Sequence, residues 1–293
     1  MSERTGIAWA DSTWNPWHGC TKVSPGCKHC YAAEWRHRLA EWGPQAERVK
    51  TSARYWREPL KWNKAEWMEC QGCGWRGDFK DTIAAGMRHV CPRCESELEW
   101  TRRRVFPSMC DPFEDNRQVA NWRGEFLKLI EETPNLDWLL LTKRPEKISS
   151  LGTDAAGEMF ELWLDCNQNV WLGTSAEDQV NFDSRVAALI NNGWAASVRF
   201  LSVEPMLGPV RIIPTFTGVQ KPKLDWVICG GESGPKARPM ETAWAEMLRD
   251  DCHTWGVKFF MKQMGGHPKK RDKWEDLPES LRIREVPNVR PTG

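Results

Sequence analysis

Short apolar runs alternate with helical patterns over most of this chain of 293 residues, and the alternation restricts its fold more than any other feature. Each run is flanked by polar residues, glycine or proline, which is typical of buried parallel strands. The runs are Val105-Phe106, Trp138–Leu141, Val170–Leu172, Val198–Leu201, Trp226–Ile228 and Val257–Met261, after a candidate first strand near Ile7 to Trp14. The helical patterns are Asn116–Glu132, Ala155–Cys166, Asp178–Asn191 and Ala243–Trp255. Strand–helix units of about thirty residues predict an α/β fold whose parallel sheet is a complete or partial (β/α) barrel, with a flat doubly wound sheet as the alternative.

Polar residues or glycines follow each of these runs. They are Ser108–Asp111, Thr142–Pro145, Gly173–Glu177, Ser202–Pro205, Gly230–Ser233 and Lys262-Gln263. Because the carboxyl ends of the strands carry the functional site in parallel barrels, we expect these segments to line one polar cavity. Some members have structural alternatives. Pro145 and Pro205 can simply end strands, and Asp111 or Glu177 can cap the next helix.

Four of the 11 cysteines form two C-x2-C knuckles, Cys70–Cys73 and Cys91–Cys94, which seventeen residues separate. This spacing is typical of a zinc ribbon, in which four thiolates close a tetrahedral site. Gly72, Gly74 and Pro92 suit the sharp turns that the knuckles require. The sequence therefore predicts a structural zinc ion in a module of about 35 residues, which is too small to fold alone.

A second group of cysteines has a different count. Cys20, Cys27 and Cys30 have the spacing C-x6-C-x2-C, in a stretch whose glycines and proline favour a loop. Three thiolates do not close a zinc site alone, but they can hold three irons of a [4Fe–4S] cluster and leave the fourth iron open for a small molecule. His18 or His29 could instead complete a Cys3His zinc site, so both alternatives stay open at this point.

The composition excludes several classes of protein. Lys and Arg number 41 and Asp and Glu 40, and this near balance excludes a globally acidic or basic protein. The first ten residues lack a cationic start with a following apolar stretch, and no apolar run has the length needed to span a bilayer. We therefore expect a cytoplasmic protein without membrane contact. In that reducing compartment, clustered cysteines indicate metal ligands rather than disulfides.

Basic and aromatic residues are interleaved between Arg36 and Lys64. The basic ones are Arg36, Arg38, Arg48, Lys50, Arg54, Arg57, Lys61 and Lys64, and the aromatic ones are Trp35, Trp42, Tyr55, Trp56 and Trp62. Basic residues contact phosphates and aromatic rings stack on bases, so the segment is a candidate nucleic-acid surface. The run Lys269–Trp274 and the triplet Arg102–Arg104 add to it. A solvated helical face with its tryptophans in the core is the alternative, but the combination with a zinc ribbon favours DNA. The tryptophans of the apolar runs are instead expected in the core: Trp138, Trp171 and Trp226.

Several longer motifs are spread over nearly the whole chain. They are Thr5–Trp9, Trp14–Pro16 with the three-cysteine loop, Leu140–Pro145, Trp171–Ser175, Phe200–Pro205 and Cys229–Pro235. Together they resemble a phage and bacterial family of radical-SAM-like proteins of unknown function (DUF5131). That family is in turn similar to the spore photoproduct lyase branch of radical SAM enzymes, which act on thymines in DNA. The resemblance omits Glu66–Arg102 and so divides the chain into an N-terminal barrel part (1–65), an inserted zinc ribbon (66–102) and the remainder of the barrel (103–293).

The resemblance implies roles for individual residues. Cys20, Cys27 and Cys30 would ligate a [4Fe–4S] cluster with S-adenosylmethionine (SAM) on the open iron, although their spacing exceeds the usual C-x3-C-x2-C by three residues. Ser108 and Asp111 occupy the place that binds the amino group of SAM. The other implied cofactor contacts are Lys143 to the SAM carboxylate, Ser175 and Glu204, and Gly230, Gly231 and Glu232 to adenosine or substrate. Cys110 would donate or relay a hydrogen atom, with a buried packing thiol as its alternative.

The function implied is a radical SAM enzyme that generates a 5′-deoxyadenosyl radical. It would modify or rearrange a thymine-derived base in DNA, as an isomerase of phage DNA hypermodification in the host cytoplasm, or reverse a lesion as a photoproduct-type lyase. A radical SAM enzyme acting on RNA, a free nucleotide or a peptide is a further alternative. Such an enzyme needs an electron donor such as flavodoxin or ferredoxin. A zinc-containing nucleic-acid-binding protein without catalysis is the alternative from another class.

Overall fold

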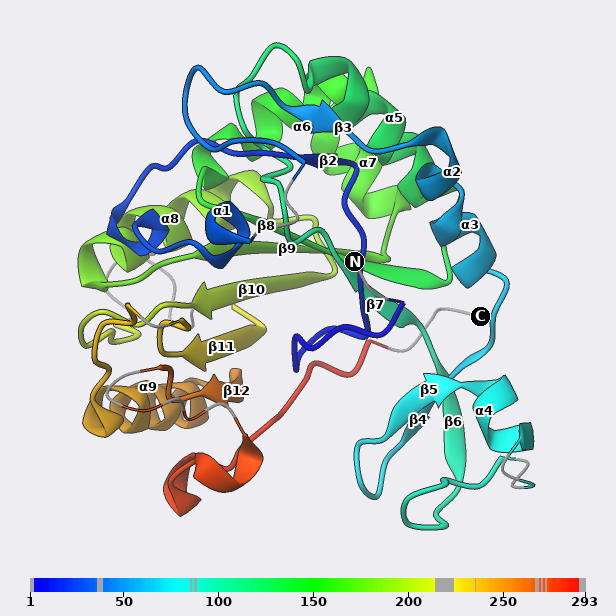
Figure 1. Ribbon diagram of the computed structural model, residues 1–293, viewed down its shortest axis with the longest axis vertical. Coiled ribbons are helices and arrows are strands. Elements are labelled where there is room, and N and C mark those ends of the chain that lie inside the picture. Colours follow the sequence, from blue (N-terminus) through cyan, green and yellow to red (C-terminus); the bar gives the residue numbers. More distant parts are fainter. Residues whose placement is uncertain are drawn as a thin grey trace.

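Seven parallel strands form one sheet in the order β1-β7-β8-β9-β10-β11-β12 (Figure 1). The computed structural model describes residues 3–35, 39–84, 86, 89–213, 224–234, 236–266, 269, 271 and 273–289. The strands are β1 (Ser12–Thr13), β7 (Arg103–Phe106), β8 (Leu136–Thr142), β9 (Val170–Ser175), β10 (Val198–Val203), β11 (Trp226–Gly230) and β12 (Lys258–Gln263). Each predicted strand overlaps one of these, so the strand prediction is confirmed.

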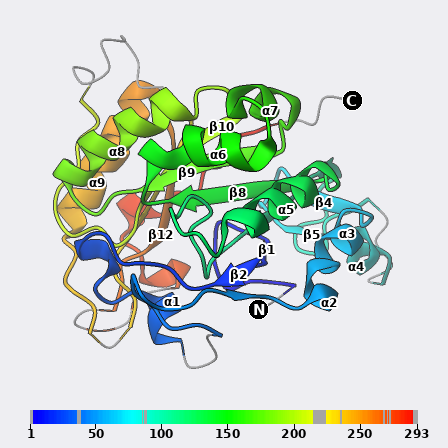
Figure 2. The same cartoon turned by 90° about the horizontal axis from the view of Figure 1, so that it is seen from above.

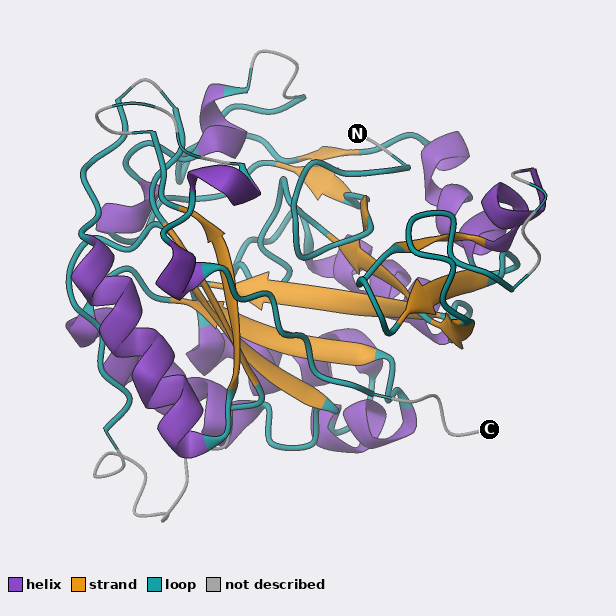
Figure 3. Ribbon diagram, turned by 90° about the horizontal axis from the view of Figure 1, so that it is seen from below, coloured by secondary structure: helices purple, strands orange, loops and turns teal. Residues whose placement is uncertain are grey.

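The helices that connect the strands cover one face of the sheet, as Figure 2 shows for α6, α8 and α9. These helices are α5 (Ala120–Glu131), α6 (Ile148–Ala156), α7 (Phe160–Cys166), α8 (Gln179–Asn192) and α9 (Thr242–Trp255). Strands that are neighbours in the sheet are also consecutive in the order β1-β7-β8-β9-β10-β11-β12. Because crossovers between parallel strands are right-handed and here all run in one direction across the sheet, the connecting helices lie on the same side. Within the described residues the edge strands β1 and β12 do not pair with each other, and the sheet curls into a half-barrel (Figure 3). The partial parallel barrel is confirmed, and the flat doubly wound alternative, which needs helices on both faces, is wrong.

The helix predicted over Ala155–Cys166 is two helices. Gly157 ends α6 in the left-handed conformation with φ of 76°, and its N–H donates to the carbonyl of Thr153 at 3.0 Å. A glycine in this conformation ends the helix even though the apolar pattern of the sequence continues past it. Gly152 lets the second helix pack closely, because a Cβ there would lie 2.3 Å from the ring of Phe160.

Two apolar layers lie on the two faces of the sheet. The outer layer joins the strands to the helices and contains Trp138. The inner layer fills the concave face with Trp9, Phe106, Trp171 and Trp226, among others, and the rings of Trp9 and Phe106 lie 4.5 Å apart. Trp138, Trp171 and Trp226 are each at most 2% exposed, so their predicted place in the core is confirmed. The C-terminal segment closes this floor, where Trp226 Nε1 donates to the carbonyl of Glu285 at 2.8 Å.

The N-terminal segment crosses the carboxyl ends of the strands. Its elements are β2 (Trp17–His18), a 3-10 turn (Pro25–Cys27), α1 (Tyr31–Glu34), β3 (Val49–Lys50), α2 (Ala53–Trp56) and α3 (Glu58–Trp62). Further 3-10 turns are Pro145–Lys147, Trp274–Asp276 and Glu279–Leu281. Among the helices described, none combines the length and the apolar character that crossing a bilayer requires.

The segment with the two knuckles forms a separate antiparallel sheet in the order β5-β4-β6, visible as a lobe at the lower right of Figure 1. Its elements are β4 (Trp67–Cys70), β5 (Arg76–Asp78), α4 (Phe79–Ala84) and β6 (Leu98–Thr101). A buried ion pair joins this lobe to the half-barrel. Arg76 donates from Nε and Nη2 to the carboxylate of Asp11 at 3.0 Å, and the N–H of Arg104 donates to the same carboxylate at 2.8 Å.

The triplet Arg102–Arg104 lies in this interface. Its members are 9%, 1% and 6% exposed. The guanidinium of Arg103 lies between the rings of Trp62 and Trp67, at 4.5 and 4.4 Å from their centroids. The prediction that the triplet belongs to a nucleic-acid surface is therefore wrong, because its charged groups are buried between the half-barrel and the lobe.

Removal of the Arg76 guanidinium is expected to destabilise the fold. Arg76→Met leaves the Asp11 carboxylate buried without its main partner, and we expect the free energy of unfolding to fall by about 3–5 kcal/mol. Urea denaturation followed by tryptophan fluorescence measures the change. Lys61→Met removes an exposed pair with Glu58 and is the control, with an expected loss below about 1 kcal/mol. Equal losses in the two variants would contradict a supporting role for the buried pair.

Candidate functional site

A cavity of about 410 Å³ lies at the carboxyl ends of the strands, and all six predicted polar segments at or after these ends contribute to its lining. The prediction that the polar strand ends meet in one cavity is confirmed. The predicted site residues in the lining are Cys20, Cys27, Cys30, Ser108, Cys110, Asp111, Lys143, Ser175, Glu204, Gly231 and Glu232. Gly230 lies just outside the lining, where its carbonyl accepts a hydrogen bond from the N–H of Met206 at 2.9 Å.

The loop that carries the three cysteines is held at its middle by a buried carboxylate. Glu177 follows β9, and its Oε1 accepts a hydrogen bond from the N–H of Gly26 at 3.1 Å. Gly26 is needed for this approach, because a Cβ there would lie 3.0 Å from Glu177 Oε2. Arg238 donates from Nη2 to the carbonyl of Pro25 at 3.0 Å. Glu177 thus positions the loop, and the cap of α8 is Asp178 instead.

The first cysteine is held by a second set of charged residues. Thr21, which follows Cys20, donates its N–H to Glu114 Oε1 at 2.8 Å, and its carbonyl accepts from Arg144 Nη2 at 2.8 Å. Arg48 forms an ion pair with Glu114 at 2.7 Å. Burial alone would raise the pKa of Glu114, but hydrogen bonds from Arg48 and Thr21 hold it below its usual value. Sequence reasoning missed Arg144, Glu114 and Arg48 as site residues; only Arg144 had a signal, because it lies in a strand-end motif.

Asp111 is fully engaged by its protein neighbours. Its Oδ1 accepts from the N–H of Phe113 at 3.0 Å, and its Oδ2 accepts from Arg144 Nη1 at 2.6 Å and from the N–H of Lys143 at 3.3 Å. The side chain is therefore a buried partner of Arg144. The resemblance implied a contact to an amino group, but the structure shows both of its oxygens in use.

Lys143 is half-buried, and its ammonium has fewer partners than the neighbouring Arg144. Its ammonium bonds to Ser175 Oγ, and among the ion pairs of the described residues none includes it. Burial lowers the pKa of Lys143, while the cysteines of the loop and Glu177 act in the opposite sense. Desolvation of a cation that has no ionic partner is costly, so this position favours an anionic ligand.

The far side of the cavity carries a further pair of charges. Lys262, at the end of β12, bonds to Glu204 Oε2, and Glu204 Oε1 accepts from Trp9 Nε1 at 3.1 Å. Glu232 instead turns toward Arg238, with 2.6 Å between Oε1 and Nη2. Glu204 therefore faces the cavity together with Lys262, whereas Glu232 supports the residue that holds the cysteine loop.

Burial keeps two cavity thiols protonated in the absence of a bound metal. It raises the pKa of Cys20, to which the carboxylates of Asp111 and Glu114 add and which Arg144 opposes. Burial also raises the pKa of Cys110 well above the ordinary thiol value. A metal bound by Cys20 would have to displace its proton, as metal binding does for thiol ligands in general.

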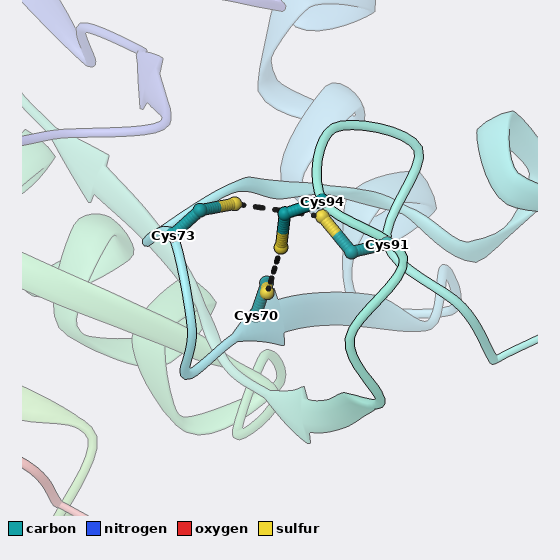
Figure 4. Close-up of side chains that lie close together, drawn as sticks. All are labelled: Cys70, Cys73, Cys91 and Cys94. Atoms are coloured by element: carbon teal, nitrogen blue, oxygen red, sulfur yellow. Dashed lines mark hydrogen bonds between the residues drawn. The ribbon is translucent and has the colours of Figure 1, made fainter.

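The four cysteines of the knuckles converge on one point (Figure 4). The Sγ atoms of Cys70 and Cys94 lie 3.5 Å apart, as do those of Cys73 and Cys91, and all four lie within 4.8 Å of one another. Thiolates at about 2.3 Å around one tetrahedral ion are about 3.8 Å apart, which these spacings approach. This group can therefore hold a metal ion such as zinc.

The two knuckles have the same backbone geometry. Gly74 and Glu95, four residues after the first cysteine of each knuckle, have φ of 67° and 62°, and each donates its N–H to that cysteine's carbonyl at 2.9 Å. The N–H groups of Cys70 and Cys91 in turn donate to residues 75 and 96 at 2.8 Å. Only Gly74 could be recognised from sequence as suited to this turn, because Glu95 is not a glycine.

The three cysteines of the cavity loop do not converge in the same way. Among the described His, Cys, Asp and Glu side chains, only the four knuckle cysteines meet as a compact set of ligand atoms. His18 Nδ1 accepts from the N–H of Leu39 at 3.2 Å, and His18 is outside the cavity lining. His29 lines the cavity, but it forms no compact set of ligand atoms with the three thiols either. The geometry therefore gives no support to a Cys3His zinc site on this loop.

The segment from Arg36 to Lys64 divides into buried and exposed parts. Arg36 and Arg38 lie outside the described residues, as do Pro235 and two members of the run Lys269–Trp274, Lys270 and Asp272. Arg48 is 3% exposed, Trp62 is buried, and Tyr55 and Trp56 pack on Trp14. The interpretation of these four residues as a nucleic-acid surface is wrong, because they belong to the interior. The exposed basic residues of the segment are Arg54, Arg57, Lys61 and Lys64.

The fold and the site define an α/β protein with a parallel half-barrel, a cavity that contains three cysteines, and a separate four-cysteine group that can hold a metal ion. The chain belongs to a family described as protein of unknown function (DUF5131), whose model matches residues 4–285. No curated protein and no solved structure matches the chain.

Loss of one knuckle thiolate is expected to remove the metal ion and unfold the lobe. The lobe has a small core of Met68, Leu98 and buried knuckle cysteines, so we expect a bound metal ion to contribute much of its stability. Elemental analysis of Cys73→Ser should show no bound zinc, and limited proteolysis should cut within residues 66–102. Cys166→Ser removes an exposed cysteine outside both groups and should keep the ion and the protease resistance. Equal zinc content in both variants would contradict the assignment.

Proposed function

We propose that this chain is a radical SAM enzyme that modifies or rearranges a thymine-derived base in DNA. The observation that carries the proposal is that three thiols of one loop open into the same cavity as Lys143, a half-buried cation without an ionic partner among the described residues. Thiolates suit iron, and a cation suits the carboxylate of SAM. The cavity therefore offers chemically distinct places for a cluster and for an anionic ligand beside it.

The donor set fits a [4Fe–4S] cluster better than a single ion. Three cysteines leave one iron free, and their sulfur atoms are not drawn together as the knuckle sulfurs are. A cluster bound there would supply one electron to cleave the sulfonium of SAM, and the protein would position the reactants and exclude water. The contacts of Glu177, Arg238 and Arg144 hold the loop in place for this purpose.

Lys143 would bind the carboxylate of SAM, and Ser175, which its ammonium contacts, would orient it. Asp111 would support Arg144 rather than contact the amino group. Gly231 and Ser108 remain in the lining and would contact the rest of the ligand. Cys110 lines the cavity, so its S–H group is placed to donate a hydrogen atom there, and burial raises the pKa of this thiol.

The proposal that DNA is the substrate rests on the resemblance and on an exposed basic surface. This surface is smaller than the one predicted from the sequence. Arg54, Arg57 and Lys64 are exposed on and beside α2 and α3, where they can contact phosphates. Trp42 lines the cavity and is the member of the aromatic segment placed to contact an extruded base. An electron donor such as flavodoxin or ferredoxin would reduce the cluster.

The cluster assignment predicts the loss of iron and of activity in Cys27→Ala. After anaerobic reconstitution with iron and sulfide, the wild type should bind about four irons beside its zinc. With dithionite and SAM it should release 5′-deoxyadenosine, and the variant should not. Cys166→Ala is the matched control and should behave as the wild type.

The same pair of variants tests the substrate. Mass spectrometry of nucleosides from DNA of cells that produce the wild type should show a changed thymine-derived nucleoside that is missing with Cys27→Ala. A wild type that binds two zinc ions and no cluster would instead indicate a non-catalytic zinc protein. Full turnover by Cys27→Ala would refute the cluster assignment.

Lys143→Ala is expected to weaken SAM binding by about 10- to 100-fold, the effect of losing a hydrogen bond between charged groups worth about 1.5–3 kcal/mol. Isothermal titration of SAM into the reconstituted protein measures this. Lys147→Ala removes an exposed cation of the same segment, which pairs with Asp115, and should leave the affinity unchanged. Equal affinities in the two variants would exclude Lys143 from the SAM site.

A further inference from the structure

Arg144 makes a contact that neither the fold nor the proposed ligands require. Its Nη1 lies 3.8 Å from the Sγ of Cys20, within reach of a hydrogen bond to sulfur. Among the hydrogen bonds of the described residues, this is the one that joins a cationic side chain to a thiol of the cysteine loop. No described residue gives the other two thiols such a donor, and Cys27 Sγ lies 4.0 Å from the neutral hydroxyl of Ser24.

The guanidinium is rigidly placed. Nη1 also donates to Asp111 Oδ2 at 2.6 Å, and Nη2 donates to the carbonyl of Thr21 at 2.8 Å. Arg144 is 9% exposed, so water does not compete strongly for these contacts. A planar fork can serve a sulfur, a carboxylate and a carbonyl together, which the single ammonium of a lysine does not reproduce.

We infer that Arg144 is a positioning residue that raises the reduction potential of the cluster through its hydrogen bond to Cys20. The inference rests on the proposed function, because it needs a cluster on this loop. Reduction adds negative charge to the cluster and its thiolates. A cationic N–H donor at a ligand sulfur stabilises that charge, and hydrogen bonds to the sulfurs are a principal determinant of cluster potentials.

The surrounding charges determine how large the effect is. Asp111 partly neutralises Arg144, but among the described residues no hydrogen bond joins its carboxylate to the sulfur of Cys20. Glu114 lies 3.8 Å from Arg144 and has its own partner in Arg48 at 2.7 Å. Asp111 and Glu114 both disfavour added negative charge at Cys20 and Arg144 opposes them, so removal of the guanidinium leaves the two carboxylates uncompensated in a region of low dielectric.

The experiment is an EPR-monitored redox titration of the reconstituted protein. Arg144→Gln keeps much of the side-chain volume and removes the charge, and we expect the equilibrium constant for reduction to fall at least tenfold, which is 59 mV for one electron. Arg144→Lys keeps the charge but not the fork, and its potential should fall by less. Lys147→Gln removes one exposed positive charge three residues away and should leave the potential unchanged.

Each outcome bears on the inference. A cluster that forms in the wild type and has the same potential in Arg144→Gln overturns the inference and leaves the proposed function standing. A wild type without a cluster overturns both. If Arg144→Gln does not fold or does not hold iron, Arg144→Lys decides, and a wild-type potential in that variant overturns the role of the hydrogen bond. A fall of equal size in Lys147→Gln would show a general charge effect and also overturn it.

Discussion

The place of the cysteine loop depends on hydrogen bonds between its backbone and charged side chains that follow the strands of the sheet. The loop has one 3-10 turn and no regular structure beyond it in the described residues, so its backbone groups need partners elsewhere. Glu177 after β9, Arg144 after β8 and Arg238 after β11 supply them. These three strand ends meet because every strand of a parallel sheet presents its carboxyl end at the same edge. The topology of the sheet thus decides where the thiols lie.

Strand β1 connects the two metal-related parts of the chain. Asp11, next to Ser12–Thr13, is bound by Arg76 of the four-cysteine lobe, and the chain continues directly to Asn15. Asn15 Oδ1 accepts from the N–H of Met109 at 2.6 Å, and the carbonyl of Met109 accepts from the N–H of Gly19 beside Cys20. A strand of two residues has few ladder bonds of its own, so the ion pair of the lobe contributes to its position. The lobe therefore supports the beginning of the cysteine loop without lining the cavity.

Much of this arrangement could be predicted from the sequence, because it depends on local patterns. Apolar runs with polar ends predicted the strands and the single cavity, and the spacing of Cys70, Cys73, Cys91 and Cys94 predicted their convergence. The charged residues could not be placed in the same way. Arg48 and Arg103 look like surface cations until their partners are known, and those partners, Glu114 and the rings of Trp62 and Trp67, are brought to them only by the fold. A count of charges along the chain does not reveal which of them are neutralised inside it.

The cavity contains two basic residues that are adjacent in sequence and have opposite roles. Arg144 is saturated by Asp111, Thr21 and Cys20, whereas Lys143 has only Ser175. A guanidinium with several fixed partners organises the protein. A desolvated ammonium with one neutral partner can still pair with an anion, and that pairing offsets the free energy lost when the anion is desolvated. The carboxylates do not divide in this way, because both oxygens of Asp111 and both oxygens of Glu204 accept hydrogen bonds from the protein. The groups that a ligand meets are therefore those that the fold leaves incompletely paired, and proximity to the cysteines alone does not identify them.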